Sequence, residues 1–283
     1  VINNAKSSDF IFGRWNGVDN SFERANFPMG YEGGNSGVCP SQNLVEAFDM
    51  RDGTPFDWNN PDHRTKALDP LERDPRLAQT VLMNGQLFKG RRVESFTGGM
   101  NGLPKEGASP TSYYLRKHLK EDTDLTTGSA TSYQHIWPFF RYAEVLLNYA
   151  EALLEATKEP DFKGIIDNVN YTLSPREAVN MVRARVDMNP IGTAGYDAFK
   201  KRLRNERRME LAFEGHRFWD IRRWKIGSST TKLEGLAITA IENENAVEGE
   251  DMYTYSYVKK TVQERIWEDR MNYYPIQDTE LFK

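Results

Sequence analysis

Three glutamates spaced four residues apart are the most obvious candidates for acid–base chemistry in this chain. Glu206, Glu210 and Glu214 would lie along one side of an α-helix, because residues four apart are neighbours on the helix surface. Two of these carboxylates could act as a general acid and base, or all three could join a buried ionic network. Arginines such as Arg207 and Arg217 lie close by in the sequence. Since guanidinium groups lower carboxyl pKa values, and such carboxyls are poor general acids, we favour the ionic network.

A second group of residues has the chemistry of sugar recognition. The apolar face of a sugar stacks on an aromatic ring, while neighbouring polar side chains hydrogen-bond its hydroxyls. Loop-like segments supply these candidate ligand-binding residues: Arg14, Trp15, Asn16, Tyr31, Asn35 and Trp58. Our hypothesis is that Trp15 stacks on a sugar, with Arg14 and Asn16 as polar partners. The alternative, that Trp15 and Trp58 fill small cores beneath long loops, stays open.

Other kinds of site find little support in the sequence. The four histidines are scattered, and Cys39 is the single cysteine, so metal-ligand spacing is absent. Glycine-rich segments at 30–34 and 98–102 do not continue into a phosphate-binding loop and are predicted to be ordinary loops. No nucleophilic serine or cysteine beside a placed histidine can be picked out. We therefore predict no metal, no cofactor and no catalytic residue.

Composition excludes two further classes of protein. The 283 residues carry a net charge of −4 with no basic run, so nucleic acid is not an expected partner. No segment approaches the roughly eighteen uninterrupted apolar residues that a membrane span needs. Residues 1–4 have neither a charged leader nor an apolar signal core. We expect a mature form, or a piece that lacks its original N-terminus.

Helical periodicity is strongest in the middle of the chain. Arg141 to Ala156 is apolar except for one polar stripe, which predicts a helix packed on most sides. Ser174 and Glu177 form a capping-box pattern that starts a second helix. A third helix is expected over roughly 198–225, with Gly215 marking a tight helix contact. The starts of the first two predicted helices are 34 residues apart, which is the length of a tetratricopeptide repeat. The consensus residues of that repeat are mostly missing here.

The regions before and after this block lack long periodic runs. A short helix capped by Ser41 is expected near the start, with strands over Leu77–Leu87, Gln86–Phe96 and Tyr113–Lys117. The tail from Gly235 is expected to be an extended segment lying over the body. We thus predict three regions: a loop-rich, ligand-facing part (1–137), a helical block (138–226) and a C-terminal extended segment (227–283).

Five segments carry particular orders of residue types: Asn205–Arg223, Arg141–Ala152, Pro40–Asp57, Arg73–Leu77 and Tyr274–Ile276. Together they resemble the SusD/RagB family of outer-membrane nutrient-binding lipoproteins. Asn205–Arg223 resembles the family's signature helix, and Arg141–Ala152 is similar to its Arg-x-Ala-Glu-Val helix. Pro40–Asp57 resembles the segment in which a Pro-(Ser/Thr)-Gln helix leads to an Asp-Gly turn. Arg73–Leu77 and Tyr274–Ile276 add further matches.

The resemblance implies both a fold and a function. The fold is mostly α-helical, a tetratricopeptide-like SusD scaffold with long ordered loops and a few short strands. The function is non-catalytic capture of glycans on the extracellular face of the outer membrane, as a lid over a SusC-like TonB-dependent transporter. Members are usually about twice this length and lipid-anchored through an N-terminal cysteine. This chain, which lacks that cysteine, is therefore expected to be the C-terminal half, with the missing N-terminal half as a partner.

Three alternatives to glycan capture stay open. A peptide-binding, RagB-like member of the same family is not separated from a glycan binder by the sequence. A glycoside hydrolase would need two carboxylates across a cleft, and Glu32 and Asp57 are conceivable in that role. A helical-repeat scaffold that binds only proteins would lack an aromatic loop site.

Overall fold

The computed structural model describes residues 7–243, 252–276 and 278–281. The α-helices in these ranges are α1 (Ser21–Asn26), α2 (Gln42–Val45), α3 (Pro61–Thr65), α4 (Pro75–Thr80), α5 (Tyr142–Thr157), α6 (Pro175–Ala184), α7 (Tyr196–Glu210), α8 (Arg217–Arg223) and α9 (Asp278–Leu281). The strands are β1 (Phe10–Asp19), β2 (Val81–Leu82), β3 (Leu87–Phe88), β4 (Arg91–Arg92), β5 (Tyr114–Leu115), β6 (Tyr133–Arg141), β7 (Gly164–Ile166), β8 (Val169–Tyr171), β9 (Lys232–Glu242) and β10 (Tyr253–Glu264). Short 3-10 turns are η1 (Gly227–Thr230) and η2 (Asp269–Asn272). None of the helices in the described ranges is long and apolar enough to span a bilayer.

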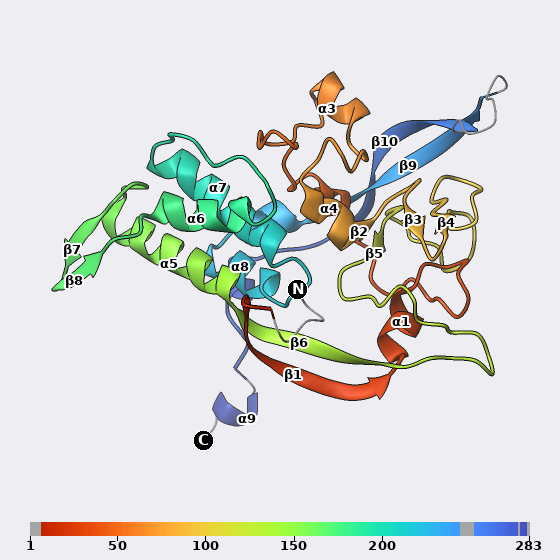
Figure 1. Cartoon of the computed structure of the whole chain (residues 1–283), viewed down its shortest axis with the longest axis horizontal. Coiled ribbons are helices and arrows are strands. Elements are labelled where there is room, and N and C mark those ends of the chain that lie inside the picture. The colour runs from red at the N-terminus through yellow and green to blue at the C-terminus, as the bar shows by residue number, and fades with distance from the viewer. Residues whose placement is uncertain (1–6, 244–251, 277, 282–283) are drawn as a thin grey trace.

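Helices α5, α6 and α7 pack side by side as the helical block (Figure 1). Leu147 and Leu154 of α5 meet Val179 of α6 and Phe199 and Leu203 of α7 in one fully buried cluster. Removing these apolar side chains from water holds the three helices together. The helix expected from the apolar run near residues 141–156 is confirmed as α5. The mostly helical scaffold with long ordered loops is confirmed as well.

The capping box of α6 offers a direct test of a local stabilising contact. The Ser174 side chain accepts a hydrogen bond from the Glu177 N–H, and the Glu177 carboxylate accepts one from the Ser174 N–H. Ser174→Ala would leave the part-buried Glu177 N–H at the helix start without its partner. We expect a loss of about 1 kcal/mol in the free energy of unfolding measured by urea titration. An unchanged urea midpoint would show that the cap contributes nothing.

The expected third helix is interrupted. Helix α7 ends at Glu210 and α8 begins at Arg217, so the single helix over 198–225 is wrong. In the intervening turn Phe213 and Gly215 have φ values of 61° and 86°, which a right-handed helix cannot contain. A Cβ on Gly215 would meet no atom within 4 Å. The glycine therefore serves the backbone turn and not, as expected, a tight helix contact.

A long antiparallel ribbon made by β1 and β6 runs along one side of the molecule (Figure 1). Its register places Phe10 opposite Arg141 and Asp19 opposite Tyr133, with β-bulges between. The segment 14–16, which was expected in a loop, lies inside β1, and that expectation is wrong. Because the side chains of a strand alternate between its two faces, the neighbours in this segment are presented to different surroundings.

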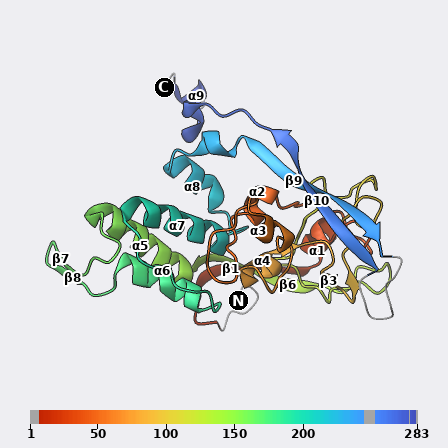
Figure 2. The same cartoon turned by 90° about the horizontal axis from the view of Figure 1, so that it is seen from above.

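A second ribbon, β9 with β10, accounts for most of the described tail (Figure 2). Lys232 pairs with Glu264 at one end, and Glu242 pairs with Tyr253 at the other. The tail expected to be a single extended segment is therefore a pair of antiparallel strands followed by the 3-10 turn η2 and the short helix α9. Leu236 and Ile238 of β9 are buried against the body, which anchors the ribbon.

Long ordered loops around short strand pairs make up residues 20–132. The Ser41 side chain accepts a hydrogen bond from the Leu44 N–H, which confirms the expected cap of α2. The strand expected over Leu77–Leu87 is wrong at its start, because Pro75 opens helix α4 under a cap from Asp74. Proline at the first helical position and an aspartate cap together favour a helix over a strand there.

Candidate functional site

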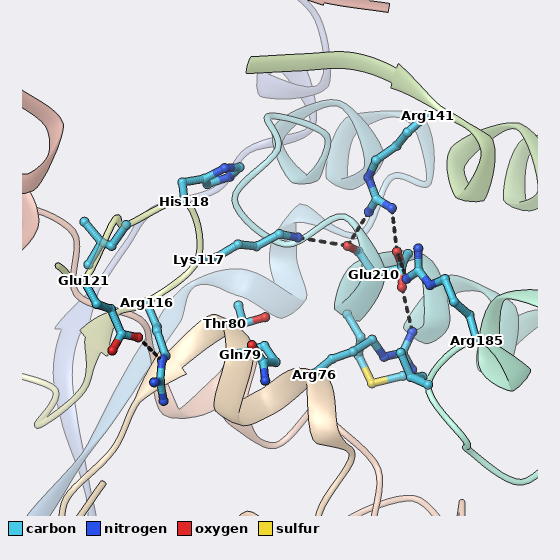
Figure 3. Close-up of a pocket in the computed structure, with 13 residues that line it drawn as sticks. Arg76, Gln79, Thr80, Arg116, Lys117, His118, Glu121, Arg141, Arg185 and Glu210 are labelled. Atoms are coloured by element: carbon cyan, nitrogen blue, oxygen red, sulfur yellow. Dashed lines mark hydrogen bonds and ion pairs between the residues drawn. The ribbon is translucent and has the colours of Figure 1, made fainter. Parts of the chain in front are cut away.

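A buried ionic network joins α7 to the loops and helices around it (Figure 3). Glu206, Glu210 and Glu214 are each 6% exposed or less. Their cationic partners, at N–O distances of 2.5–2.9 Å, are Arg76, Arg141, Arg183, Arg185 and Lys117. The ionic network predicted from the spacing of the glutamates is thus present.

The network keeps the Glu210 and Glu214 carboxylates ionised. Burial alone would raise the pKa of Glu210, but the guanidinium groups of Arg141 and Arg76 overcome it and hold that pKa well below its usual range. Burial likewise opposes ionisation of Glu214, and the adjacent Lys117 ammonium lowers its pKa overall. A general acid needs a pKa near the working pH, so these glutamates are unsuited to that role.

The depressed pKa values predict how stability depends on pH. In the unfolded chain a glutamate side chain has a pKa of about 4.3. The pKa values of Glu210 and Glu214 in the folded protein lie below it. Their ionic contribution is therefore fully present above about pH 4.3 and is lost as the pH falls through their folded pKa values. Burial raises the pKa of Asp49, so this carboxyl group makes the opposite contribution to the pH dependence of stability. It is one group against the two glutamates. We expect the free energy of unfolding to decrease below about pH 4.5 in urea titrations. An increase in that range would contradict the network's role.

A cavity of about 530 Å³ lies against the β1–β6 ribbon, and we call it the ribbon cavity. It is lined from β1, α1 and β6, with one residue from the loop after β5. The lining residues are Arg14, Asn16, Gly17, Asp19, Ser21, Phe22, Ala25, His118, His135, Ile136 and Trp137. Two of the residues predicted from the sequence, Arg14 and Asn16, are thus brought together in one cavity.

The chemistry of the ribbon cavity combines aromatic rings with hydrogen-bonding groups. Trp137 is half-buried and stacks on the His118 ring, with centroids 4.9 Å apart. His135 pairs with the buried Glu23 carboxylate at 2.9 Å, which fixes the imidazole at the cavity wall. Hydrogen bonds from the hydroxyl and N–H of Ser21 lower the pKa of Asp19. A rigid ring beside oriented donors and acceptors is the arrangement that a sugar requires.

Trp15 does not line this cavity, although Arg14 and Asn16 do. Trp15 is 53% exposed, and its ring packs edge-to-face with Phe10 at a centroid distance of 5.8 Å. The tryptophan on the cavity side is Trp137, which pairs with Arg14 across the ribbon. Sequence reasoning missed Trp137. Alternation of ring-bearing residues at 133, 135 and 137 was the strand signal that could have found it.

Two of the predicted site residues, Tyr31 and Asn35, make contacts that hold the loops around them. Tyr31 is 7% exposed, with Phe88 against it at 5.0 Å and the Arg91 guanidinium over its ring at 3.6 Å. Both contacts cover the ring in this structure, and a role for Tyr31 in ligand binding stays a prediction. The Asn35 side chain is exposed, and its amide donates to the Arg24 carbonyl at 2.9 Å, which pins the loop.

Trp58 lies on a separate loop, away from the ribbon cavity. It is half-buried, packs against the core cluster that contains Phe48, and has the Lys259 ammonium 5.7 Å from its ring centre. Neither of the alternatives left open, a core plug or a ligand platform, is excluded by this position. Its participation in ligand binding stays a prediction.

A second cavity, of about 490 Å³, adjoins the first, and we call it the charged cavity (Figure 3). It is lined by Arg76, Gln79, Thr80, Arg116, Lys117, His118, Leu119, Glu121, Arg141, Arg185, Val186, Met209 and Glu210. His118 lines both cavities. Burial, together with the neighbouring Lys117 charge, lowers the pKa of His118 to about 4, so its imidazole is neutral at neutral pH. Across the described ranges no group of three or more His, Cys, Asp or Glu side chains is placed to hold a metal ion.

Comparison with known proteins points to one family. The model of the SusD family matches residues 4–283. A SusD-like protein from Bacteroides fragilis has 26% sequence identity and a TM-score of 0.75, covering 98% of this chain and 53% of its own. A second structure from that organism, described as a SusD-like carbohydrate-binding protein, has 28% identity and a TM-score of 0.68, covering 92% of this chain and 50% of its own.

A curated relative is similar over a shorter range. SusD-like protein P2 from Formosa agariphila is 37% identical over 102 residues, which is 34% of this chain and 18% of that protein. The chain spans about half the length of the solved relatives that it matches.

Proposed function

Because this chain belongs to the SusD family, we propose that it binds glycans at the cell surface without cleaving them. The observation that carries the proposal is the ribbon cavity, where Trp137 stands beside Arg14 and Asn16. An aromatic face with flanking donors suits a sugar ring and its hydroxyls. The Bacteroides fragilis relative described as carbohydrate-binding supports the same ligand class.

The carboxylates argue against glycosidic-bond cleavage. A glycoside hydrolase uses a pair of carboxyl groups flanking the bond, one of them an acid with a raised pKa. Asp19 is the single carboxylate among the lining residues of the ribbon cavity, and its pKa is lowered. In the adjoining cavity Glu210 is held ionised by its arginines. The proposal is therefore for binding, not for hydrolysis.

The finer parts of the proposal follow from the family. The protein would deliver its glycan, as a lid, to a SusC-like TonB-dependent transporter at the extracellular face of the outer membrane. A lipid anchor on an N-terminal cysteine outside this chain would hold it there, and a further N-terminal half would complete the scaffold. Within this chain, residues 1–137 would face the ligand, 138–226 would form the scaffold, and 227–283 would brace it.

Native gel electrophoresis with a panel of soluble polysaccharides tests the proposal. The protein should migrate more slowly in a gel that contains its ligand, and the same samples should release no reducing sugar. Release of reducing sugar would overturn the non-catalytic assignment. No retardation by any polysaccharide in the panel would reject glycan-polymer binding and favour the peptide-binding alternative, which calorimetry with peptide mixtures would then test.

A further inference from the structure

The two cavities are placed to hold parts of one ligand. His118 lines both, and its ring stacks on Trp137 of the ribbon cavity. Each cavity falls within the range of about 300–1,000 Å³ that is typical of ligand sites. A sugar seated beside Trp137 would therefore have its neighbouring unit at the mouth of the charged cavity.

Cationic groups outnumber carboxylates on the wall of the charged cavity. The wall carries two carboxylates, Glu121 and Glu210, and five cations, which are Arg76, Arg116, Lys117, Arg141 and Arg185. Other carboxylates that balance these cations, such as Asp74 and Glu214, are bonded to them but do not line the cavity. Since charge interactions fall with distance, a group inside the cavity experiences mainly the nearer, positive wall.

Two of these cations are committed to the fold. Every guanidinium nitrogen of Arg76 and Arg141 bonds to a carboxylate or carbonyl oxygen. Among the described residues, these bonds use all five N–H donors of Arg141 and four of the five of Arg76, so Arg141 offers no further hydrogen bond to a ligand and Arg76 keeps one N–H, at Nη2.

Arg116 and Lys117 retain donors that a ligand can use. Arg116 bonds to Glu121 through Nε at 2.6 Å and to the Ala78 carbonyl through Nη1, while its Nη2 has no partner within the described part of the chain. Lys117 donates to Glu214 and to the Glu210 carbonyl, which leaves its third N–H without a partner among the described residues. Their side chains are 26% and 12% exposed. In Figure 3 both lie on the side of the cavity opposite Arg141 and Arg185, with the Arg116 guanidinium turned toward Glu121 and the Lys117 ammonium toward Glu210.

Building on the proposed glycan function, we infer that the charged cavity binds the anionic group of an acidic oligosaccharide through Arg116 and Lys117. An adjoining sugar ring of the same ligand lies in the ribbon cavity. A uronate carboxylate and a sulfate ester both present oxygens that accept charge-assisted hydrogen bonds from these donors.

Calorimetric titration of the protein with matched acidic and neutral ligands tests this inference. One pair is oligogalacturonate and its methyl ester, and the other is sulfated carrageenan oligosaccharide and its desulfated form. We expect the acidic member of one pair to bind about tenfold more tightly at low salt, a preference that shrinks as sodium chloride is added. The pair that shows the preference identifies the group as carboxylate or sulfate.

Variants at two arginines locate the preference. Arg116→Gln should bring the acidic-to-neutral affinity ratio toward one, whereas Arg64→Gln should leave it unchanged. Arg64 is exposed on α3 and lines neither cavity. Because the salt dependence is measured on the unaltered protein, the test does not rely on Arg116→Gln folding normally.

The outcomes separate this inference from the proposed function. Equal binding of acidic and neutral forms, or binding of neutral forms alone, overturns the inference and leaves glycan binding intact. An acidic preference that Arg116→Gln does not reduce also overturns it. If neither pair binds, the inference is overturned, and the proposed function fails with it only if the polysaccharide panel also gives no retardation.

Discussion

Glu210→Gln should destabilise this protein by about 3–5 kcal/mol, because it breaks a buried ionic network at its centre. The Glu210 carboxylate accepts hydrogen bonds from Arg76, Arg141 and Arg185 at 2.5–2.9 Å and is 3% exposed. A neutral amide of the same shape removes the negative charge that these three guanidinium groups share. Because the site is buried, water cannot replace that charge by solvating them. Removing one partner of a buried charge group costs more than the pairing itself contributes.

Equilibrium unfolding in urea, followed by circular dichroism, measures this effect. The expected loss is a large part of the roughly 5–15 kcal/mol that stabilises a typical domain, so the midpoint should move far to lower urea. Glu155→Gln is the matched control. Glu155 also pairs with more than one cation, Lys158 and Lys200, but its side chain is 34% exposed. Glu155→Gln should lower the free energy of unfolding by less than about 1 kcal/mol. If both variants lowered the free energy of unfolding by similar amounts, burial would not increase the contribution of the network to stability.

Local patterns in the sequence predicted the helices that those patterns specify. The apolar run near 141–156 has one polar stripe, and the capping box at Ser174 needs only four adjacent residues, so both were confirmed. The spacing of Glu206, Glu210 and Glu214 likewise predicted an ionic network. What it did not predict was the set of partners, because Arg76 and Arg141 are far away in the sequence.

The errors arise where distant segments decide the structure. Segment 14–16 is a strand because it pairs with 136–137, more than a hundred residues later, and no local signal announces that pairing. The break between α7 and α8 depends on positive φ at Phe213 and Gly215, and Phe213 gives no hint of it. Tyr31 lay in a glycine-rich stretch typical of exposed loops, yet Phe88 and Arg91 cover it. Of the residues that line the ribbon cavity, the sequence therefore singled out the polar Arg14 and Asn16 but not Trp137.

Trp137→Ala should weaken glycan binding by about 2 kcal/mol, or roughly thirtyfold in Kd, if the ribbon cavity is the site. The substitution removes the ring that lies beside Arg14 and Asn16, and with it the platform for the apolar face of a sugar. Trp137→Phe keeps a smaller ring and should lose less. The measurement is calorimetric titration with the polysaccharide that retards the protein in gels, after circular dichroism has shown that the variant is folded.

Trp15→Ala is the control that makes this comparison decisive. Trp15 is the same residue type on the same ribbon, but its 53% exposed ring does not line the cavity. If the cavity is the site, Trp15→Ala leaves the affinity unchanged while Trp137→Ala reduces it. The reverse result would place the sugar on the outer face of the ribbon, where Trp15 stacks on it as the sequence first suggested. Arg14 and Asn16 would then lie on the wrong face to serve as its polar partners, so the site would need a different set of hydrogen-bonding groups.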